Sequence, residues 1–181
     1  MSLWRTLLLG ALLALSSTTA GYAQKKSTTQ PEETGFCGDD LPKHLVPVPK
    51  DVLKLLLARE DVQDALSLAT NEQKAHPSRY LHAAEIHLGP EDETDLVIIG
   101  SSPLSGADND WFWIVRAPNK NPKIVFWEGA SCIYIGTNRT NGFRDISSIW
   151  ASASEQKRVI YRFNGSEYKA GKAKWSKNNY H

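Results

Sequence analysis

The chain has 181 residues, of which 21 are Lys or Arg and 20 are Asp or Glu, and its formal net charge at pH 7 is +1. Phosphate neutralisation by Lys and Arg supplies most of the affinity of proteins for nucleic acid, so a balanced chain has no general attraction to such polyanions. The composition therefore argues against a nucleic-acid binder.

Residues 1–23 have the pattern of a secretory signal peptide. One basic residue, Arg5, precedes an apolar run over residues 7–15, and small residues lie one and three positions before Gln24. The apolar run is shorter than the roughly 20 residues that a membrane-spanning helix needs. We expect cleavage after Ala23 and a mature protein that is secreted or periplasmic. Because no cysteine follows the cleavage point directly, we expect no stable membrane anchor after cleavage.

The 158 residues that remain correspond to one domain. Residues 24–35 contain no apolar side chain, so we expect a disordered linker before a single globular domain over residues 36–181. In an oxidising compartment the two cysteines of the chain, Cys37 and Cys132, favour a disulfide that closes a loop of 95 residues. The alternative is two separate buried thiols.

Residues 50 to about 71 are predicted to be helical, because apolar residues recur there at spacings of three and four. Pro49 suits the first turn of such a helix. The pattern is consistent with one kinked helix and with two short ones.

From Ser78 onward the apolar period changes to two, which indicates β-strands. The predicted strands span residues 80–88, 95–100, 111–117, 123–127, 132–136, 146–153, 158–163 and 167–172. Asn164-Gly165 predicts a tight hairpin turn between the last two. No helical segment separates the strands, so neighbours should pair antiparallel. We expect an α+β fold, with an N-terminal helical segment packed on a mainly antiparallel β-sheet or flattened sandwich.

Residues 89–95 form an acidic turn that runs into the apolar sequence Leu96-Val97-Ile98. Closely spaced carboxylates before an apolar strand resemble the calcium loop and strand of FG-GAP or VCBS-type repeats. The resemblance covers about a dozen residues and occurs once, whereas a repeat fold needs several units. It implies a Ca²⁺ ion bound through Asp92 and Asp95, and the alternative is an acidic hairpin turn without a cofactor.

Three later segments, residues 111–113, 140–146 and 161–165, together resemble uncharacterised secreted bacterial proteins. This resemblance implies a compartment and a fold type. It implies no activity.

Aromatic residues are concentrated in the strand half, and we take Trp111, Trp113 and Trp127 as candidate ligand-binding residues. An exposed aromatic face beside Asn, Asp or Arg can stack on sugar rings or hold a partner protein. Both faces of the strand over residues 111–117 are apolar, which favours a central strand that is covered on both sides. A place in the core is therefore the alternative for these rings.

No catalytic residues are predicted, because the chain has no Gly-x-Ser-x-Gly elbow, no Gly-x-Gly-x-x-Gly motif and no phosphate loop. The sequence favours a non-catalytic binding module for an envelope or extracellular protein or for a glycan, through the aromatic-rich sheet. The alternatives are a small extracellular hydrolase with a site assembled across the sheet, and a purely structural envelope protein.

Overall fold

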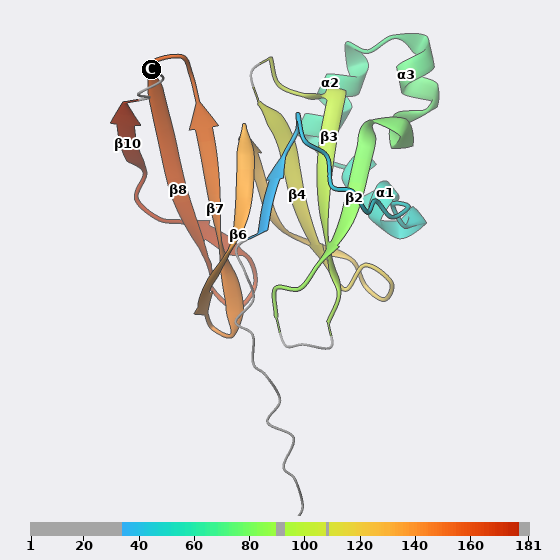
Figure 1. Ribbon diagram of the computed structural model, residues 1–181. Helices are drawn as coiled ribbons and strands as arrows, with labels where there is room; N and C mark the ends of the chain where they lie inside the picture. The colour runs from blue at the N-terminus through green and yellow to red at the C-terminus, as the bar shows by residue number, and fades with distance from the viewer. Residues whose placement is uncertain (1–33, 90–92, 108, 178–181) are drawn as a thin grey trace, which may run out of the picture.

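The computed structural model describes residues 34–89, 93–107 and 109–177, and these residues form mainly antiparallel β-sheet (Figure 1). The predicted signal peptide lies outside the described residues, as does the predicted linker up to residue 33. The helices are α1 (Lys50–Leu57), α2 (Glu60–Ser67), α3 (Asn71–Ala75) and the 3-10 helix η1 (Pro77–Tyr80). The strands are β1 (Thr34–Cys37), β2 (Leu81–Ile86), β3 (Asp95–Ser105), β4 (Asp110–Arg116), β5 (Lys123–Ala130), β6 (Cys132–Thr140), β7 (Phe143–Ala151), β8 (Glu155–Phe163), β9 (Tyr168–Ala170) and β10 (Lys174–Lys177).

The strands form two sheets rather than one. Sheet A has the order β1-β6-β7-β8-β10, with β9 also paired to β8, and sheet B has the order β2-β3-β4-β5. Every pairing between these strands is antiparallel, which confirms the predicted antiparallel architecture. In Figure 1 the two sheets face one another, and α1, α2 and α3 lie beyond the far side of sheet B.

Sheet B is covered on both faces because its strands are apolar on both faces. In β4, Phe112 and Ile114 belong to a core between the two sheets, whereas Trp113 and Val115 belong to a second core that also contains α1 and α2 residues. All four side chains are fully buried. The central, doubly covered position that the sequence predicts for this strand is thus the observed one.

The helical segment is broken rather than continuous. Helix α1 ends at Leu57 and α2 begins at Glu60, so the alternative of two short helices is the observed one. Val52, Leu56 and Val62 are fully buried against sheet B. None of the helices in the described part of the chain is long and apolar enough to cross a membrane.

The predicted disulfide between Cys37 and Cys132 is present. The two residues are direct partners in the ladder between β1 and β6, and their Cα atoms are 4.2 Å apart. The bond therefore fixes β1 to β6. β1 is an edge strand that begins at Thr34, two residues inside the predicted linker.

The predicted hairpin after β8 exists, but its turn is displaced by one residue. Phe163 pairs with Tyr168, and the Asn164 amide donates to the Glu167 carbonyl, so the two central residues are Gly165 and Ser166. The reason is the Asn164 side chain, whose Oδ1 accepts hydrogen bonds from the amides of Ser166 and Glu167. The turn that does have Asn-Gly at its centre is Asn141-Gly142, between β6 and β7, where both φ angles are positive.

Replacing Gly165 by Val should lower the free energy of unfolding by about 1–2 kcal/mol, because its φ of 106° is a conformation that a β-branched residue adopts only with strain. Urea denaturation of the variant and the parent measures the difference. Ser166→Val is the matched control, since Ser166 is the other central residue and its φ is not positive. Equal stability of Gly165→Val and Ser166→Val would contradict the prediction.

Candidate functional site

The three tryptophans that the sequence predicts as ligand-binding residues differ in their exposure to solvent. Trp113 is fully buried between sheet B and the helices, so its ring is part of the core and is not available to a surface ligand. Trp111 is half-buried and makes edge-to-face contacts with Trp113 and Trp127. Trp127 is 42% exposed, and the Arg59 guanidinium lies 5.4 Å from the centre of its ring. This cation–π contact places Arg59, which lies between α1 and α2, on the exposed ring.

Asp95, nominated as a calcium ligand, is fully buried at the start of β3. Its carboxylate faces the Arg116 guanidinium, with Oδ1 3.6 Å from Nε, and Arg116 also forms an ion pair with Glu93. Burial raises the pKa of Asp95 to about 6, although Arg116 opposes the shift. Asp92 lies outside the described residues, and within the described ranges no group of three His, Cys, Asp or Glu side chains could hold a metal ion. The calcium site therefore stays a prediction, and the observed partner of Asp95 is a cation.

A pocket of about 220 Å³ lies where β5 of sheet B faces β7, β8 and β10 of sheet A. We name it the Trp150–Trp175 pocket, and its lining residues are Glu128, Gly129, Ser148, Trp150, Lys157 and Trp175. The two indole rings are 6.3 Å apart at an interplanar angle of 71°. Trp150 is half-buried, and Trp175 is 60% exposed. The pocket therefore offers two aromatic surfaces set nearly at right angles.

Two polar groups of this pocket, Glu128 and Ser148, form hydrogen bonds with the buried Tyr161. The Tyr161 hydroxyl donates a hydrogen bond to the Glu128 carboxylate and accepts one from Ser148 at 3.4 Å. Burial, followed by the hydrogen bond to Glu128, raises the pKa of Tyr161 above its ordinary value, so the hydroxyl remains a donor at neutral pH. The Glu128 carboxylate is thus oriented before any ligand arrives.

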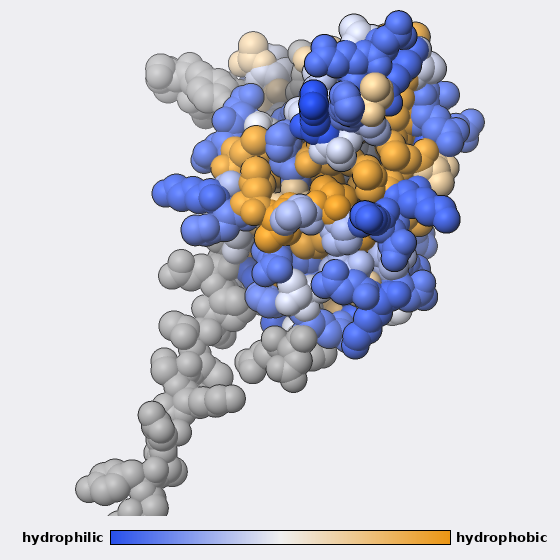
Figure 2. All heavy atoms as spheres, turned by 90° about the vertical axis from the view of Figure 1, so that its right-hand side faces the viewer, coloured by the Kyte–Doolittle hydropathy of each residue, from blue (hydrophilic) through white to orange (hydrophobic). Residues whose placement is uncertain are grey.

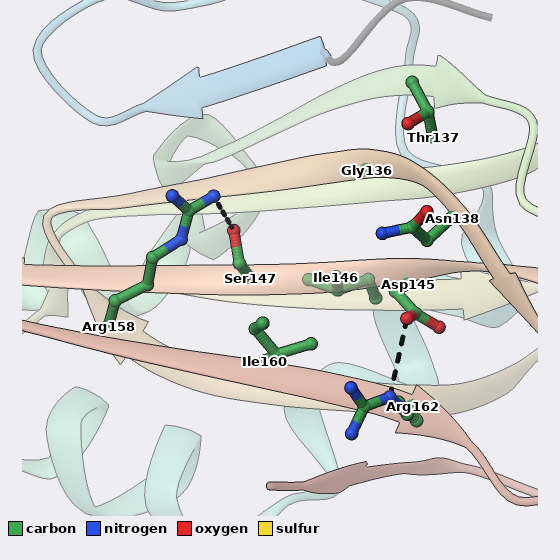
Figure 3. Close-up of a pocket in the computed structure, with 9 residues that line it drawn as sticks. All are labelled: Gly136, Thr137, Asn138, Asp145, Ile146, Ser147, Arg158, Ile160 and Arg162. Atoms are coloured by element: carbon green, nitrogen blue, oxygen red, sulfur yellow. Dashed lines mark hydrogen bonds and ion pairs between the residues drawn. The ribbon is translucent and has the colours of Figure 1, made fainter. Parts of the chain in front are cut away.

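A second hollow, of about 290 Å³, lies on the outer face of sheet A (Figure 3). We name it the Arg158–Arg162 groove, and it is lined by Gly136, Thr137, Asn138, Asp145, Ile146, Ser147, Arg158, Ile160 and Arg162. Figure 3 shows Ile160 between the two arginines, with Asn138 and Thr137 on the opposite wall. Arg158 donates to the Ser147 hydroxyl at 3.1 Å, and the Nε of Arg162 lies 3.6 Å from Asp145 Oδ2.

The far wall of the groove is a bulge in β6 that a buried arginine supports. The register between β6 and β7 shifts between Ile135 and Arg139, so residues 136–138 have no regular partners in β7. Arg144, which is buried, donates from Nε to the Gly136 carbonyl at 2.7 Å and from Nη2 to the Ile135 carbonyl at 2.9 Å. The hydrogen bond to Gly136 pairs a carbonyl of the irregular segment, and the two bonds together fix the wall in place.

The face that carries the helices has a different character. Hydrophobic residues form a band across the middle of this face, with hydrophilic residues above and below it (Figure 2). On α1 a shallow hollow of about 420 Å³ is lined by Lys50, Leu53, Lys54, Leu57 and Ala58. These lining residues include no hydrogen-bond acceptor side chain, so the hollow lacks the converging polar groups with which proteins select small ligands.

No model of a known protein family matches this chain, no curated protein matches it in sequence, and no solved structure matches it in fold. The functional argument therefore depends on the geometry of the two hollows. The sequence does not single out either of them. Trp150 and Trp175 belong to the same aromatic-rich half as the nominated rings, and no local pattern distinguishes them. The one local signal for the groove is the strand 158–163, whose alternation sets Arg158, Ile160 and Arg162 on the face away from the core.

Proposed function

We propose that this protein is a non-catalytic binding module of the secreted or periplasmic space, and that it binds a glycan in the Trp150–Trp175 pocket. The observation that carries the proposal is the pair of indole rings, set nearly at right angles around a hollow that also contains a carboxylate and an ammonium group. A sugar ring has an apolar C–H face that packs on an aromatic ring, and hydroxyls at its edge that bind charged and polar groups. The pocket supplies both kinds of contact.

The size of the pocket supports a glycan over a protein partner. A hollow of about 220 Å³ admits one ring-sized group, whereas a stable protein interface buries about 800 Å² on each partner. Glu128, Lys157 and Ser148 line the hollow beside the rings, so acceptors and donors lie at its edge. This distribution matches a hydroxyl-bearing ring better than an apolar side chain.

The carboxylates support binding over hydrolysis. Glycoside hydrolases use two carboxyl groups that flank the bond to be cleaved. Among the described lining residues, the Trp150–Trp175 pocket contains Glu128 alone, and the Arg158–Arg162 groove contains Asp145 alone. The extracellular hydrolase is therefore not the function that we propose.

The disulfide supports the proposed compartment. Disulfides persist in oxidising environments such as the periplasm and the extracellular space, and reduced thiols predominate in the cytosol. Cys37 and Cys132 are paired, and the sequence of residues 1–23 has the pattern of an export signal. Mass spectrometry of the exported protein should find Gln24 at its N-terminus, and a full-length chain kept in the cytoplasm would contradict the proposal on location.

Trp175→Ala should weaken glycan binding about tenfold, the loss expected when one stacking contact worth about 1.4 kcal/mol is removed. The measurement is isothermal titration of the disulfide-bonded protein with neutral chito-, cello- and malto-oligosaccharides, to find the best ligand, followed by the same titration of the variant. Trp127→Ala is the matched control, because Trp127 is a similarly exposed indole outside the pocket.

The expected result is a loss for Trp175→Ala and unchanged affinity for Trp127→Ala. A loss for Trp127→Ala alone would move the site to the Trp111–Trp127 surface and overturn the assignment of the pocket. Absence of binding for the whole panel would overturn the glycan proposal. Trp175 is largely exposed, so its replacement should leave the urea midpoint unchanged.

A further inference from the structure

We propose that the Arg158–Arg162 groove is a second binding site, specific for an acidic saccharide such as a short uronic acid chain. The groove lies on the outer face of sheet A, whereas the Trp150–Trp175 pocket lies between the sheets. The two sites are therefore independent, and this proposal does not depend on the function proposed above.

The positive charges of the groove are spaced for an extended ligand. Arg158 and Arg162 are four residues apart on β8, so their Cα atoms are separated by about 13 Å at the usual strand rise. Ile160, between them, gives the groove an aliphatic floor (Figure 3). A guanidinium binds a carboxylate through two parallel hydrogen bonds, so two such groups suit a chain that carries carboxylates along its length.

Asp145 also lines the groove, and its carboxylate needs a hydrogen-bond donor that a simple anion does not provide. Its side chain is 13% exposed, and its Oδ1 is buried without a hydrogen-bond partner among the described residues. The Asp145 carboxylate lines the groove beside Arg162, so the part of it that faces the groove can accept a hydrogen bond from a ligand hydroxyl. The groove therefore calls for a ligand that brings anionic groups to the arginines and also a hydroxyl to Asp145.

This combination distinguishes an acidic saccharide from an acidic peptide. A uronic acid residue carries a carboxylate and several hydroxyls on one ring, and both types of group are matched in the groove. The side chains of a Glu or Asp run provide carboxylates and no hydroxyl, so none of them can donate a hydrogen bond to Asp145. Asn138, on the bulge, offers an amide that both donates and accepts at the opposite wall.

The groove is built before the ligand arrives. The bulge that carries Thr137 and Asn138 is held by two hydrogen bonds from the buried Arg144, and the Tyr168 hydroxyl donates to the Arg144 carbonyl at 2.7 Å. Arg158 is placed by Ser147. A wall that is already ordered loses little conformational freedom on binding, which favours a defined ligand over nonspecific attraction.

The experiment is isothermal titration of the disulfide-bonded protein with three probes: trigalacturonate, its neutral analogue galactotriose, and the peptide Glu-Glu-Glu. Three variants are compared with the parent. Arg162→Gln removes a cation of the groove that is 58% exposed, Asp145→Asn removes the acceptor charge, and Lys54→Gln removes an exposed cation from α1, which lies beyond sheet B and does not line the groove.

We expect trigalacturonate to bind and the other two probes to bind at least tenfold more weakly. Arg162→Gln should weaken trigalacturonate binding about tenfold, and Lys54→Gln should change it less than twofold. Asp145→Asn should weaken it several-fold, although the variant is one charge more positive. Trp175→Ala should leave this binding unchanged, which separates the result from that of the Trp150–Trp175 pocket.

The Asp145→Asn variant decides between a built site and diffuse attraction. If it strengthens the binding of trigalacturonate, Asp145 acts as a repelling charge and the saccharide assignment is overturned. Preference for Glu-Glu-Glu would make the groove an acidic-peptide site, and equal losses for Lys54→Gln and Arg162→Gln would show nonspecific attraction to positive charge; either result overturns the proposal. Absence of trigalacturonate binding would also overturn the proposal. Arg162→Lys, which keeps the charge without the planar fork, should recover only part of the loss.

Discussion

Replacing Cys37 and Cys132 by serine should lower the free energy of unfolding by about 4–5 kcal/mol, because the bond closes a loop of 95 residues and restricts the unfolded chain. The bond also fixes β1, and with it Phe36, which is buried in the core between the sheets. Urea denaturation of the variant, and of the parent under a reducing agent, measures the loss by two routes that should agree.

The single variant Cys132→Ser is the control that separates the bond from the side chains. A lone thiol at Cys37 cannot form the bridge, so the single and double variants should unfold at nearly the same urea concentration. A double variant within about 1 kcal/mol of the parent would contradict the prediction, and would mean that the unfolded chain is already compact.

Replacing Arg116 by Met should lower the free energy of unfolding by about 3–5 kcal/mol at about pH 7.5, because it leaves the Asp95 carboxylate buried without a countercharge. Met keeps part of the packing of the Arg116 side chain, whose guanidinium lies 4.2 Å from the centre of the Phe143 ring. Glu93→Gln is the control, since Glu93 is the exposed partner of Arg116 and its pair should contribute less than about 1 kcal/mol.

The same pair predicts how stability depends on pH. Because burial raises the pKa of Asp95 to about 6 in the folded protein, the folded state binds a proton more tightly than the unfolded state does. The contribution of Asp95 to stability is therefore greatest below its unfolded pKa and is lost as the pH rises through about 6. Between about pH 4.5 and about pH 7.5 the loss is about 2 kcal/mol.

Chemical denaturation over this pH range, with Asp95→Asn for comparison, isolates the contribution of Asp95. The difference in stability between the parent and Asp95→Asn should change by about 2 kcal/mol, in favour of the parent at the acidic end. The loss in Arg116→Met should likewise shrink at acidic pH, where Asp95 is protonated. A difference that does not vary with pH would show that Asp95 keeps its ordinary pKa in the folded protein.

The strand half could be predicted because the alternation of residue types records which side chains face the core. The pattern over residues 158–163 places Val159, Tyr161 and Phe163 on one face, and the structure buries all three between the sheets. By the same reasoning, the two apolar faces of β4 predict that it is a central strand covered on both sides. Covalent pairing of the two cysteines followed from their number and the predicted compartment.

The two hollows proposed as binding sites could not be predicted from residue type alone, because the exposure of a side chain is set by its tertiary position. Trp113 and Trp175 have the same side chain, yet Trp113 lies on a central strand and is fully buried, and Trp175 lies on an edge strand and is 60% exposed. Likewise, the groove depends on the register shift after Ile135, and on Arg144 of β7, whose hydrogen bonds support the bulge in β6 while the two groove arginines lie on β8. Local periodicity carries no information on such contacts.

Because sheet B is covered on both faces, the two sheets differ in how well they tolerate amino-acid substitutions. Nearly any substitution in β3 or β4 disturbs one of two cores, whereas no second layer of described residues covers the outer face of sheet A (Figure 1). Exposed substitutions of that kind usually alter stability by less than about 0.5 kcal/mol. Randomising Thr137, Asn138 and Ile160 should therefore yield many folded proteins. If the proposed saccharide site exists, its ligand preference can change by such substitutions while the two cores of sheet B remain intact.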